Sequence, residues 1–171
     1  LADEAKQTLH KTEVALDVLV GEAVLRYLPK ADAAGVDLGA KGIDHAVTVQ
    51  GNAALIEGIL NNLIDNALRY GRAPSGDSHI TVSVTQTYQQ VTLSVTDNGA
   101  GVPAQKLQQI SQRWVQGAAG EALKAGVGLG LAIVGTYAKL MGARVDVQPE
   151  QPQGLCVRVV WSADVAVDPL D

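Results

Sequence analysis

Two short segments of alternating apolar and polar residues constrain the fold of this chain most strongly. Residues 80–85 and 91–95 both repeat with a period of two, and a short stretch separates them. The apolar positions are Ile80, Val82, Val84, Val91, Leu93 and Val95. This period predicts the two strands of a β-hairpin with one face buried. A sheet with one apolar face needs a covering layer, which helices of the same chain can supply.

The rest of the sequence predicts helices and strands in alternation. We expect helices over 17–28, 52–70, 105–114 and 129–141, and further strands over 14–16, 46–49, 145–147 and 155–161. Asp17 and Asn52 are expected to cap helices, and Pro29 is expected to end one. Residues 31–42 are small and contain glycine, so we expect a turn there. This order predicts a single α+β domain whose sheet is covered on one face by helices.

Composition and charge narrow the functional classes. The formal net charge is −5 and no basic stripe is visible, which argues against a nucleic-acid binder. The single cysteine, Cys156, excludes a disulfide framework and is expected to be a small buried side chain. No stretch approaches the ~20 apolar residues of a membrane span. We place the domain at residues 13–162, with 1–12 as the end of a helix or a linker and 163–171 as a tail.

Two asparagines stand out on the helix expected over residues 52–70. Asn62 and Asn66 are one helical turn apart, at the edge of the apolar face. Amides in such a position are partly buried and need hydrogen-bond partners. A ligand or a metal ion could supply these partners, and so could neighbouring loops of the protein.

An acidic residue follows directly on the second strand of the hairpin. The segment from Asp97 to Val102 reads Asp-Asn-Gly-Ala-Gly-Val, with glycines at Gly99 and Gly101. Such an arrangement can hold a carboxylate against a flat heterocycle while the backbone turns sharply. Asp-Asn-Gly is also ordinary turn chemistry, and the segment alone does not decide between the two interpretations.

A glycine-rich turn precedes the helix expected over residues 129–141. The run from Gly126 to Leu131 reads Gly-Val-Gly-Leu-Gly-Leu, and glycine-rich turns at helix N-termini present N–H donors to phosphates. It is not a Walker A loop, because no Gly-Lys-Ser/Thr ends it. It is not the dinucleotide fingerprint either, because Leu131 stands where the third glycine would be. A flexible hinge is the alternative.

Together the three motifs resemble the N, G1 and G2 boxes of the Bergerat ATP-binding fold. Sensor histidine kinases, the gyrase B subunit, mismatch-repair ATPases and anti-sigma-factor serine kinases share this fold. Residues 62–70 look specifically like the histidine-kinase N box, and residues 110–117 resemble that family's F box. The resemblance runs from Val14 to Trp161. It implies a two-layer α/β sandwich with a mixed, mostly antiparallel sheet, and an ATP-binding catalytic domain over 13–162.

The resemblance also implies ATP and Mg²⁺ as cofactors and gives roles to individual residues. Asn66 would hold Mg²⁺, and Asn62 would lie near the phosphates and the waters of the metal. Asp97 would accept a hydrogen bond from the adenine amino group, beside Tyr70. The implied catalytic residues are Asn62, Asn66, Arg69 and Arg113. The implied nucleotide-binding residues are Asn62, Asn66, Arg69, Tyr70, Asp97, Gly99, Gly101, Val102, Gly126, Val127, Gly128, Leu129, Gly130, Leu131 and Gly154.

Several positions depart from the pattern of the family. Ser111 and Trp114 stand where phenylalanine is usual, and Gln116 stands where arginine is frequent. Leu155 replaces a common threonine, and Gly58 occupies a site that is often acidic. These departures put a phosphate contact and a hydroxyl contact in doubt.

The chain lacks the phosphoacceptor that a histidine kinase requires. None of its three histidines, His10, His45 and His79, lies in a His-Glu-x-x-x-Pro-like box. We therefore expect the acceptor on a separate dimerisation hairpin of the same parent kinase, with residues 1–12 as the end of that hairpin. A response regulator would be the next partner, and the isolated domain is expected to be monomeric. The resemblance places the domain in the cytoplasm, in a parent anchored in the bacterial inner membrane.

Three other functions share the fold. Gyrase-like ATPases carry a glutamate one turn before the metal-binding asparagine to activate water. Asn62 occupies that position and cannot act as a base, so steady ATP hydrolysis is not expected. An anti-sigma-type serine kinase and a nucleotide-binding scaffold remain as alternatives to the histidine kinase.

Overall fold

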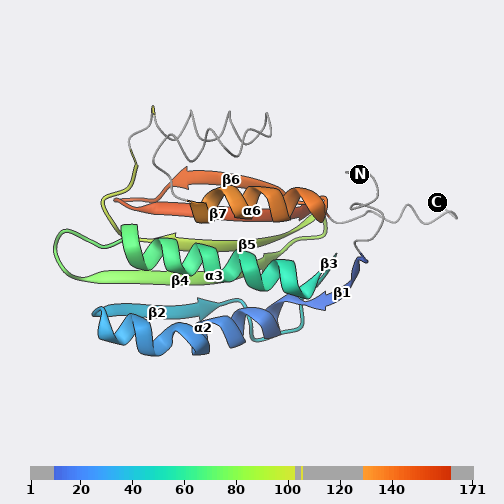
Figure 1. Ribbon diagram of the computed structural model, residues 1–171, viewed down its shortest axis with the longest axis horizontal. Helices are drawn as coiled ribbons and strands as arrows, with labels where there is room; N and C mark the ends of the chain where they lie inside the picture. The colour runs from blue at the N-terminus through green and yellow to red at the C-terminus, as the bar shows by residue number, and fades with distance from the viewer. Residues whose placement is uncertain (1–9, 103–104, 106–128, 163–171) are drawn as a thin grey trace, which may run out of the picture.

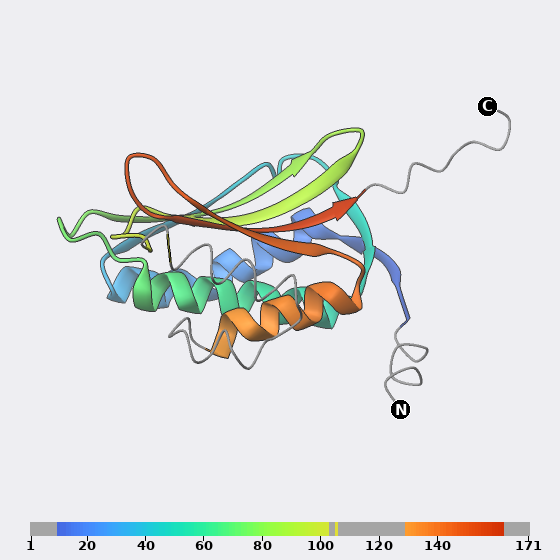
Figure 2. The same cartoon turned by 90° about the horizontal axis from the view of Figure 1, so that it is seen from above.

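The protein is a two-layer α/β sandwich with its helices gathered on one face of the sheet. The computed structural model describes residues 10–102, 105 and 129–162. In these ranges the helices α2, α3 and α6 run side by side over a five-stranded sheet, as Figures 1 and 2 show from two directions. The elements are β1 (Thr12–Ala15), α2 (Leu16–Ala33), β2 (Val36–Lys41), β3 (Thr48–Gly51), α3 (Ala53–Tyr70), β4 (Ser78–Gln86), β5 (Gln90–Asp97), α6 (Leu129–Leu140), β6 (Arg144–Pro149) and β7 (Leu155–Ser162).

The main sheet is mixed and mostly antiparallel, as expected. Its strand order is β2-β4-β5-β7-β6, in which only β2 and β4 run parallel. Strands β1 and β3 form a separate antiparallel pair. The expected fold class is confirmed. Within the described part of the chain, no helix is long and apolar enough to cross a lipid bilayer.

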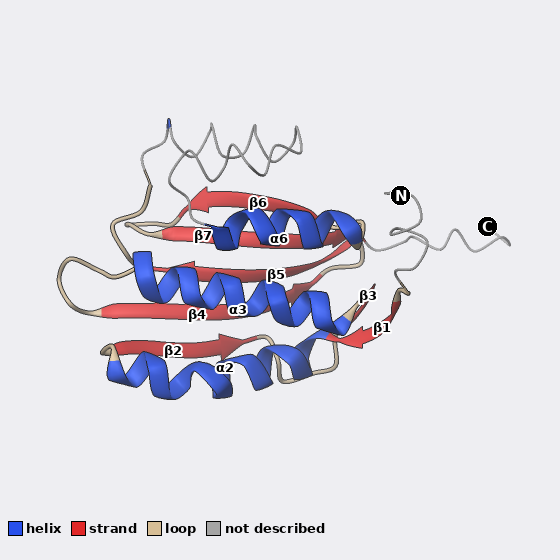
Figure 3. Cartoon of the chain, viewed as in Figure 1, coloured by secondary structure: helices blue, strands red, loops and turns tan. Residues whose placement is uncertain are grey.

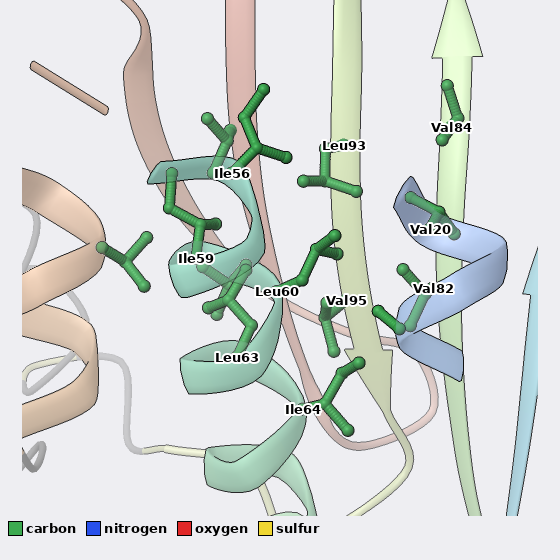
Figure 4. Close-up of a cluster of buried hydrophobic side chains, with 14 of the residues drawn as sticks. Val20, Ile56, Ile59, Leu60, Leu63, Ile64, Val82, Val84, Leu93 and Val95 are labelled. Atoms are coloured by element: carbon green, nitrogen blue, oxygen red, sulfur yellow. The ribbon is translucent and has the colours of Figure 1, made fainter. Parts of the chain in front are cut away.

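The hairpin predicted from the alternating pattern is strands β4 and β5. Ile80, Val82 and Val84 are at most 2% exposed and face the helices. Val82 and Val84 lie beside Val20 of α2, and the same buried cluster includes the apolar residues of α3, as Figure 4 shows. The opposite face of the sheet, which the described helices leave uncovered, carries the cross-strand pairs Thr81–Thr96, Ser83–Ser94 and Thr85–Thr92. The period of two therefore separates an apolar face from a hydroxyl-bearing one.

Two expectations near the N-terminal end of the domain are wrong. Helix α2 continues through Pro29 to Ala33 instead of stopping before it. Pro29 lies on the exposed side of α2, where the carbonyl group that loses its partner can bond to water. Asp17 is not the N-cap; Ala15 occupies that position, and the Asp17 carboxylate accepts a hydrogen bond from the Val47 backbone N–H at 3.1 Å.

The segment expected to carry a turn has one at Ala34 and Gly35, but it also contains a strand that was not expected. Residues 36–41 form β2, which pairs in parallel with β4 over Val36–Ser78 to Lys41–Ser83. Val36 and Leu38 are buried beneath α2, and they alternate with the exposed Asp37 and the half-buried Gly39. The other expected elements are present with shifted ends, β1 and β3 among them, and Asn52 caps α3 by accepting from the Leu55 N–H at 3.1 Å. The helix expected over 105–114 lies outside the described residues except for Gln105.

Candidate nucleotide site

The candidate site residues of the described ranges gather at one end of the sandwich. Asn66, Arg69 and Tyr70 lie in the last turns of α3, Asp97 ends β5, and Gly154 immediately precedes β7. Figure 3 shows these three chain segments meeting at the same end of the sheet, where α6 also begins. The topology thus brings together residues that the sequence separates widely.

Helix α3 positions the two asparagines at the margin of its buried face. The Asn52 cap fixes where the helix begins, and its apolar side is buried at Ile56, Ile59, Leu60, Leu63, Ile64, Ala67 and Leu68. Asn62 and Asn66 are both half-buried, as their place beside this face predicts. The Asn62 side-chain amide donates to the Gly58 carbonyl oxygen at 2.6 Å, so it is satisfied within its own helix. Neither the ligand interpretation nor the loop interpretation anticipated this bond.

The Asn66 amide has no such internal partner. Its Nδ2 atom is buried and has no hydrogen-bond partner among the described residues. A buried donor left in this state costs about 1–3 kcal/mol, so a ligand that supplies an acceptor gains that amount on binding. Rotation of the amide by half a turn presents its oxygen in place of its nitrogen. Asn66 can therefore donate to a phosphate oxygen or offer an oxygen to a cation.

The residues present fit Mg²⁺ only as an ion whose shell is completed by water and by oxygens of the nucleotide. Among the described residues, no group of three or more His, Cys, Asp or Glu side chains could hold a metal. Mg²⁺ accepts one or two protein oxygens when water and phosphate oxygens complete its shell. The Asn66 amide oxygen can supply one such contact.

Asp97 is a buried carboxylate at the end of β5. It is 8% exposed, and its Oδ1 accepts a hydrogen bond from the Gly99 N–H at 2.9 Å. Burial raises the pKa of Asp97 above its ordinary value, and the Glu150 charge adds to this rise. The N–H groups of Gly99 and Leu155 act in the opposite direction and lower the pKa. A largely dry carboxylate of this kind is a strong acceptor for a donor that reaches it.

Glycines let the backbone close around this carboxylate. Gly154 has φ +121°, and a Cβ atom there would lie 1.9 Å from the Asp97 carbonyl oxygen. Gly101 has φ +76°, and its Cβ position lies 3.1 Å from the Gly154 carbonyl oxygen. Both residues combine a left-handed backbone with a tight neighbour, which only glycine tolerates. Gly101 of the predicted motif and Gly154, which precedes β7, thus let the turn lie against the start of β7.

Arg69 and Tyr70 are exposed at the end of α3. The Arg69 guanidinium carbon lies 5.9 Å from the centre of the Tyr70 ring, and the tyrosine is 62% exposed. Val102 is half-buried and packs against the core, whereas Leu131, in the first half of α6, is buried. The pair Arg69–Tyr70 is therefore available to a ligand, and Leu131 is part of the core.

The remaining predicted site residues are only partly described. Leu129 and Gly130 are the first two residues of α6. Arg113, Gly126, Val127 and Gly128 lie outside the described residues, as do Ser111, Trp114 and Gln116.

The sequence did not predict the residues whose hydrogen bonds hold the turn immediately after Asp97. Asn98 accepts from the His79 N–H at 2.7 Å and donates to the Asp77 carbonyl at 2.7 Å. The Gln153 side chain donates to the Asn98 carbonyl oxygen at 3.2 Å. The Asp-Asn-Gly turn signal could have indicated Asn98, because asparagine side chains bond to nearby backbone in turns. Nothing local indicates Gln153.

The sandwich and the residues at its end define a Bergerat-type nucleotide-binding domain. Residues 51–165 match the family described as histidine kinase-, DNA gyrase B-, and HSP90-like ATPase, and the chain belongs to this family. The sensor protein CutS of Streptomyces coelicolor is 32% identical over 160 residues, which are 93% of this chain and 38% of CutS. The chain therefore spans well under half the length of this curated relative.

Solved histidine kinases share the fold. Full-length ShkA in complex with AMPPNP superposes with a TM-score of 0.70 at 24% identity, over 89% of this chain and 31% of ShkA. Histidine kinase ThkA in complex with the response regulator protein TrrA gives a TM-score of 0.67 at 18% identity, over 90% of this chain and 42% of ThkA. Together with the family match and the similarity to CutS, this shared fold confirms the resemblance to the catalytic domains of sensor histidine kinases.

Proposed function

We propose that the chain binds ATP with Mg²⁺ and donates the γ-phosphoryl group to a histidine on a separate dimerisation hairpin. The observation that carries the proposal is the Asp97 carboxylate, buried at the end of β5 beside the glycines and facing the end of α3. Burial of a carboxylate costs free energy because its charge is desolvated, so a buried acid in a candidate site indicates a functional role. The family match and the AMPPNP complex of ShkA support an adenine nucleotide as the ligand.

In this proposal each residue does one physical task. Asp97 accepts a hydrogen bond from the amino group of adenine, and Gly101 lets the backbone approach the ring. Asn66 contacts the metal or a phosphate oxygen, and Asn62 lies one turn away from it. Arg69 provides a permanent positive charge for phosphate.

Mg²⁺ would supply charge neutralisation at the phosphates when it is bound. Phosphoryl transfer needs mainly positioning and charge stabilisation, so no covalent protein intermediate is required in this chain. The residues Arg113, Gly126, Val127 and Gly128 complete the predicted site and keep the roles that the family implies.

The acceptor histidine is proposed to lie on another domain of the parent kinase. His45 and His79 are exposed and contact aspartates, at 3.1 Å to Asp44 and 3.2 Å to Asp37. These contacts explain both residues as surface hydrogen-bond partners of aspartates. The ThkA–TrrA complex supports a response regulator as the next recipient of the phosphoryl group. We also propose a cytoplasmic location, in a parent anchored in the inner membrane, and a monomeric isolated domain.

One observation favours a second candidate, a nucleotide-binding scaffold without transfer activity. Leu155, half-buried, pairs directly with Asp97 across β5 and β7 and offers no hydroxyl group. A scaffold would bind the nucleotide but leave the hairpin histidine unmodified.

Calorimetric titration tests the nucleotide proposal. ADP and a non-hydrolysable ATP analogue are titrated with Mg²⁺ and with EDTA, and GTP serves as the control. Adenine-selective binding that Mg²⁺ strengthens is expected. Absence of binding by a folded sample would reject both candidates. Phosphorylation of the parent's hairpin domain, added separately, then distinguishes the kinase from the scaffold.

A further inference from the structure

Gly71, the residue that follows α3, is a glycine that its backbone does not require. Its φ of −92° and ψ of 26° are accessible to any L-amino acid. Its N–H donates to the Ala67 carbonyl oxygen at 2.9 Å, as an ordinary helix end does. The reason for glycine must therefore lie in the space around it.

That space is filled by the carboxylate of Asp97. A Cβ atom at position 71 would lie 2.6 Å from both Cγ and Oδ2 of Asp97, and 2.8 Å from the Ala67 carbonyl oxygen. In turn, a Cβ atom at Gly99 would lie 2.6 Å from the carbonyl carbon of Gly71. The end of α3 and the turn after β5 are thus in direct contact, and Asp97 Oδ2 lies against the bare Cα of Gly71.

We propose that Gly71 is a positioning residue that fixes the orientation of the Asp97 carboxylate toward the purine base. The Gly99 N–H holds Oδ1 at 2.9 Å, and the Gly71 backbone blocks the side on which Oδ2 could turn away. The inference rests on the proposed function, because it requires Asp97 to contact the base. A side chain at position 71 would rotate the carboxylate and impair recognition of the base without touching the phosphate contacts.

A pair of nucleotides that differ only at the base separates this effect from a general loss of binding. ADP carries an amino group at purine position 6, where inosine diphosphate carries a carbonyl oxygen. A carboxylate oriented toward position 6 accepts from the amino group of ADP and repels the carbonyl oxygen of inosine diphosphate, whose additional hydrogen on N1 lies at the neighbouring ring position. The ratio of the two Kd values therefore reports the carboxylate, whereas the Kd for inosine diphosphate reports the rest of the site.

The experiment compares the parent chain with Gly71→Ala and with the control Gly39→Ala. Gly39 lies on β2, and a Cβ atom there meets nothing within 4 Å. In Gly71→Ala we expect the Kd ratio to fall by about tenfold, the usual effect of impairing a hydrogen bond to a charged group. The Kd for inosine diphosphate should stay within about twofold, and Gly39→Ala should match the parent in both values.

Two other kinds of outcome would overturn the inference. If Gly71→Ala weakens ADP and inosine diphosphate equally, Gly71 has only a packing role and the inference is wrong. If the parent binds neither nucleotide, the proposed function fails; if it binds both equally, the assignment of Asp97 to the base fails, and in either case the inference fails as well. These two results are distinguished by the parent chain alone.

A second measurement covers the case in which Gly71→Ala does not fold. Replacing Asp97 by alanine removes the Cγ and Oδ2 atoms that the new side chain would meet. Gly71→Ala should therefore lower the thermal unfolding midpoint less in the Asp97→Ala background than in the parent. Equal lowering in both backgrounds would show that the two residues are not coupled and would overturn the inference.

Discussion

Asp97 combines the proposed recognition of the base with a cost in stability. Its burial raises the pKa, so the folded state favours the protonated acid over the carboxylate. The ordinary value is 3.8, and the folded value lies above it. The favourable contribution of this group to folding is therefore complete below pH 3.8 and is lost as the pH rises through the folded pKa.

Replacing Asp97 by asparagine should change stability and binding in opposite directions. Asp97→Asn removes a buried charge, so at neutral pH the variant is expected to unfold at higher urea concentration than the parent. This gain should disappear as the pH falls below 3.8. Adenine-nucleotide affinity should drop by about tenfold or more, because an acceptor becomes a mixed donor and acceptor. Urea unfolding across pH and calorimetry check the two effects, and unchanged ATP binding would contradict the assignment of the base site.

Asn66→Ala tests the amide that lacks an internal partner. The variant is expected to lose about tenfold or more of the Mg²⁺-dependent affinity for an ATP analogue, while the affinity in EDTA changes little. Asn61→Ala is the matched control, because Asn61 is on the same helix but bonds to Arg26 of α2 at 2.7 Å. Equal losses with and without the metal would argue against a metal contact by Asn66.

Among single residues, the sequence predicted those whose chemistry is visible in the motif. Asp97 and Asn66 lie where the motifs place them, at the end of a strand and on one side of a helix. Gly71 could not be predicted in the same way, because a glycine after a helix is the usual stop signal. Its contact is with a carboxylate that belongs to a distant strand, and only the tertiary structure shows it.

At the level of elements, the errors of prediction follow from exposure and from long-range pairing. Pro29 was expected to end α2, but the helix continues past it to Ala33 and so buries Ala31. Strand β2 was not recognised, because its partner β4 lies beyond β3 and α3 in the sequence. Local patterns report what a segment can form, whereas the partner of an edge strand is decided by the whole sheet.

Pro29→Ala should stabilise the domain. The substitution restores a donor within α2 and removes the contact between the proline ring and the preceding turn. We expect the free energy of unfolding to rise by about 1–3 kcal/mol, within the cost usually assigned to proline inside a helix. Urea denaturation measures the change, with Glu22→Ala at an exposed position of the same helix as the control. Destabilisation by Pro29→Ala would mean that the native path of α2 depends on its proline, and the prediction would be wrong.

The contact between α2 and α3 should weaken in alkaline solution. The Tyr27 hydroxyl donates to Asp65 Oδ2 at 3.0 Å, and Lys30 Nζ lies 2.9 Å from Asp65 Oδ1. Burial, followed by the hydrogen bond to Asp65, raises the pKa of Tyr27 from 10.0 to about 12. The neutral phenol is thus favoured in the folded state, so its contribution is full below pH 10.0 and is lost as the pH rises towards about 12. Tyr27→Phe should remove this part of the alkaline loss of stability, which urea unfolding at several pH values would detect; an unchanged alkaline profile would contradict it.

On the scale of the whole molecule, the residues of the candidate site come together only in the folded domain. Its parts come from the end of α3, the end of β5 and the start of β7, which meet through the central strand pairing of β5 with β7. The sequence predicted this convergence through a resemblance and not through periodicity. Periodicity alone gives two layers but does not say which ends of the layers adjoin.

Nucleotide binding should therefore be linked to global stability. At a free concentration of about 100 times Kd, ADP with Mg²⁺ is expected to raise the free energy of unfolding by about 2.7 kcal/mol. The shift should follow the concentration of ADP in thermal unfolding, and it should be smaller in Asp97→Ala. A calorimetric binding signal without any shift in the unfolding midpoint would indicate binding outside the folded site.

The glycines around Asp97 limit which second mutations could rescue a damaged site. A side chain at Gly154 would meet the Asp97 backbone, and one at Gly99 would meet the backbone of Gly71. No exchange of a side chain can move those atoms aside, so substitutions there should have no suppressor at the contact. At Gly71 the nearest atoms include those of the Asp97 side chain itself. In a selection for restored folding, second-site suppressors of a Gly71 variant should thus arise at position 97. Such suppressors would replace Asp97 and so remove the carboxylate that Gly71 accommodates.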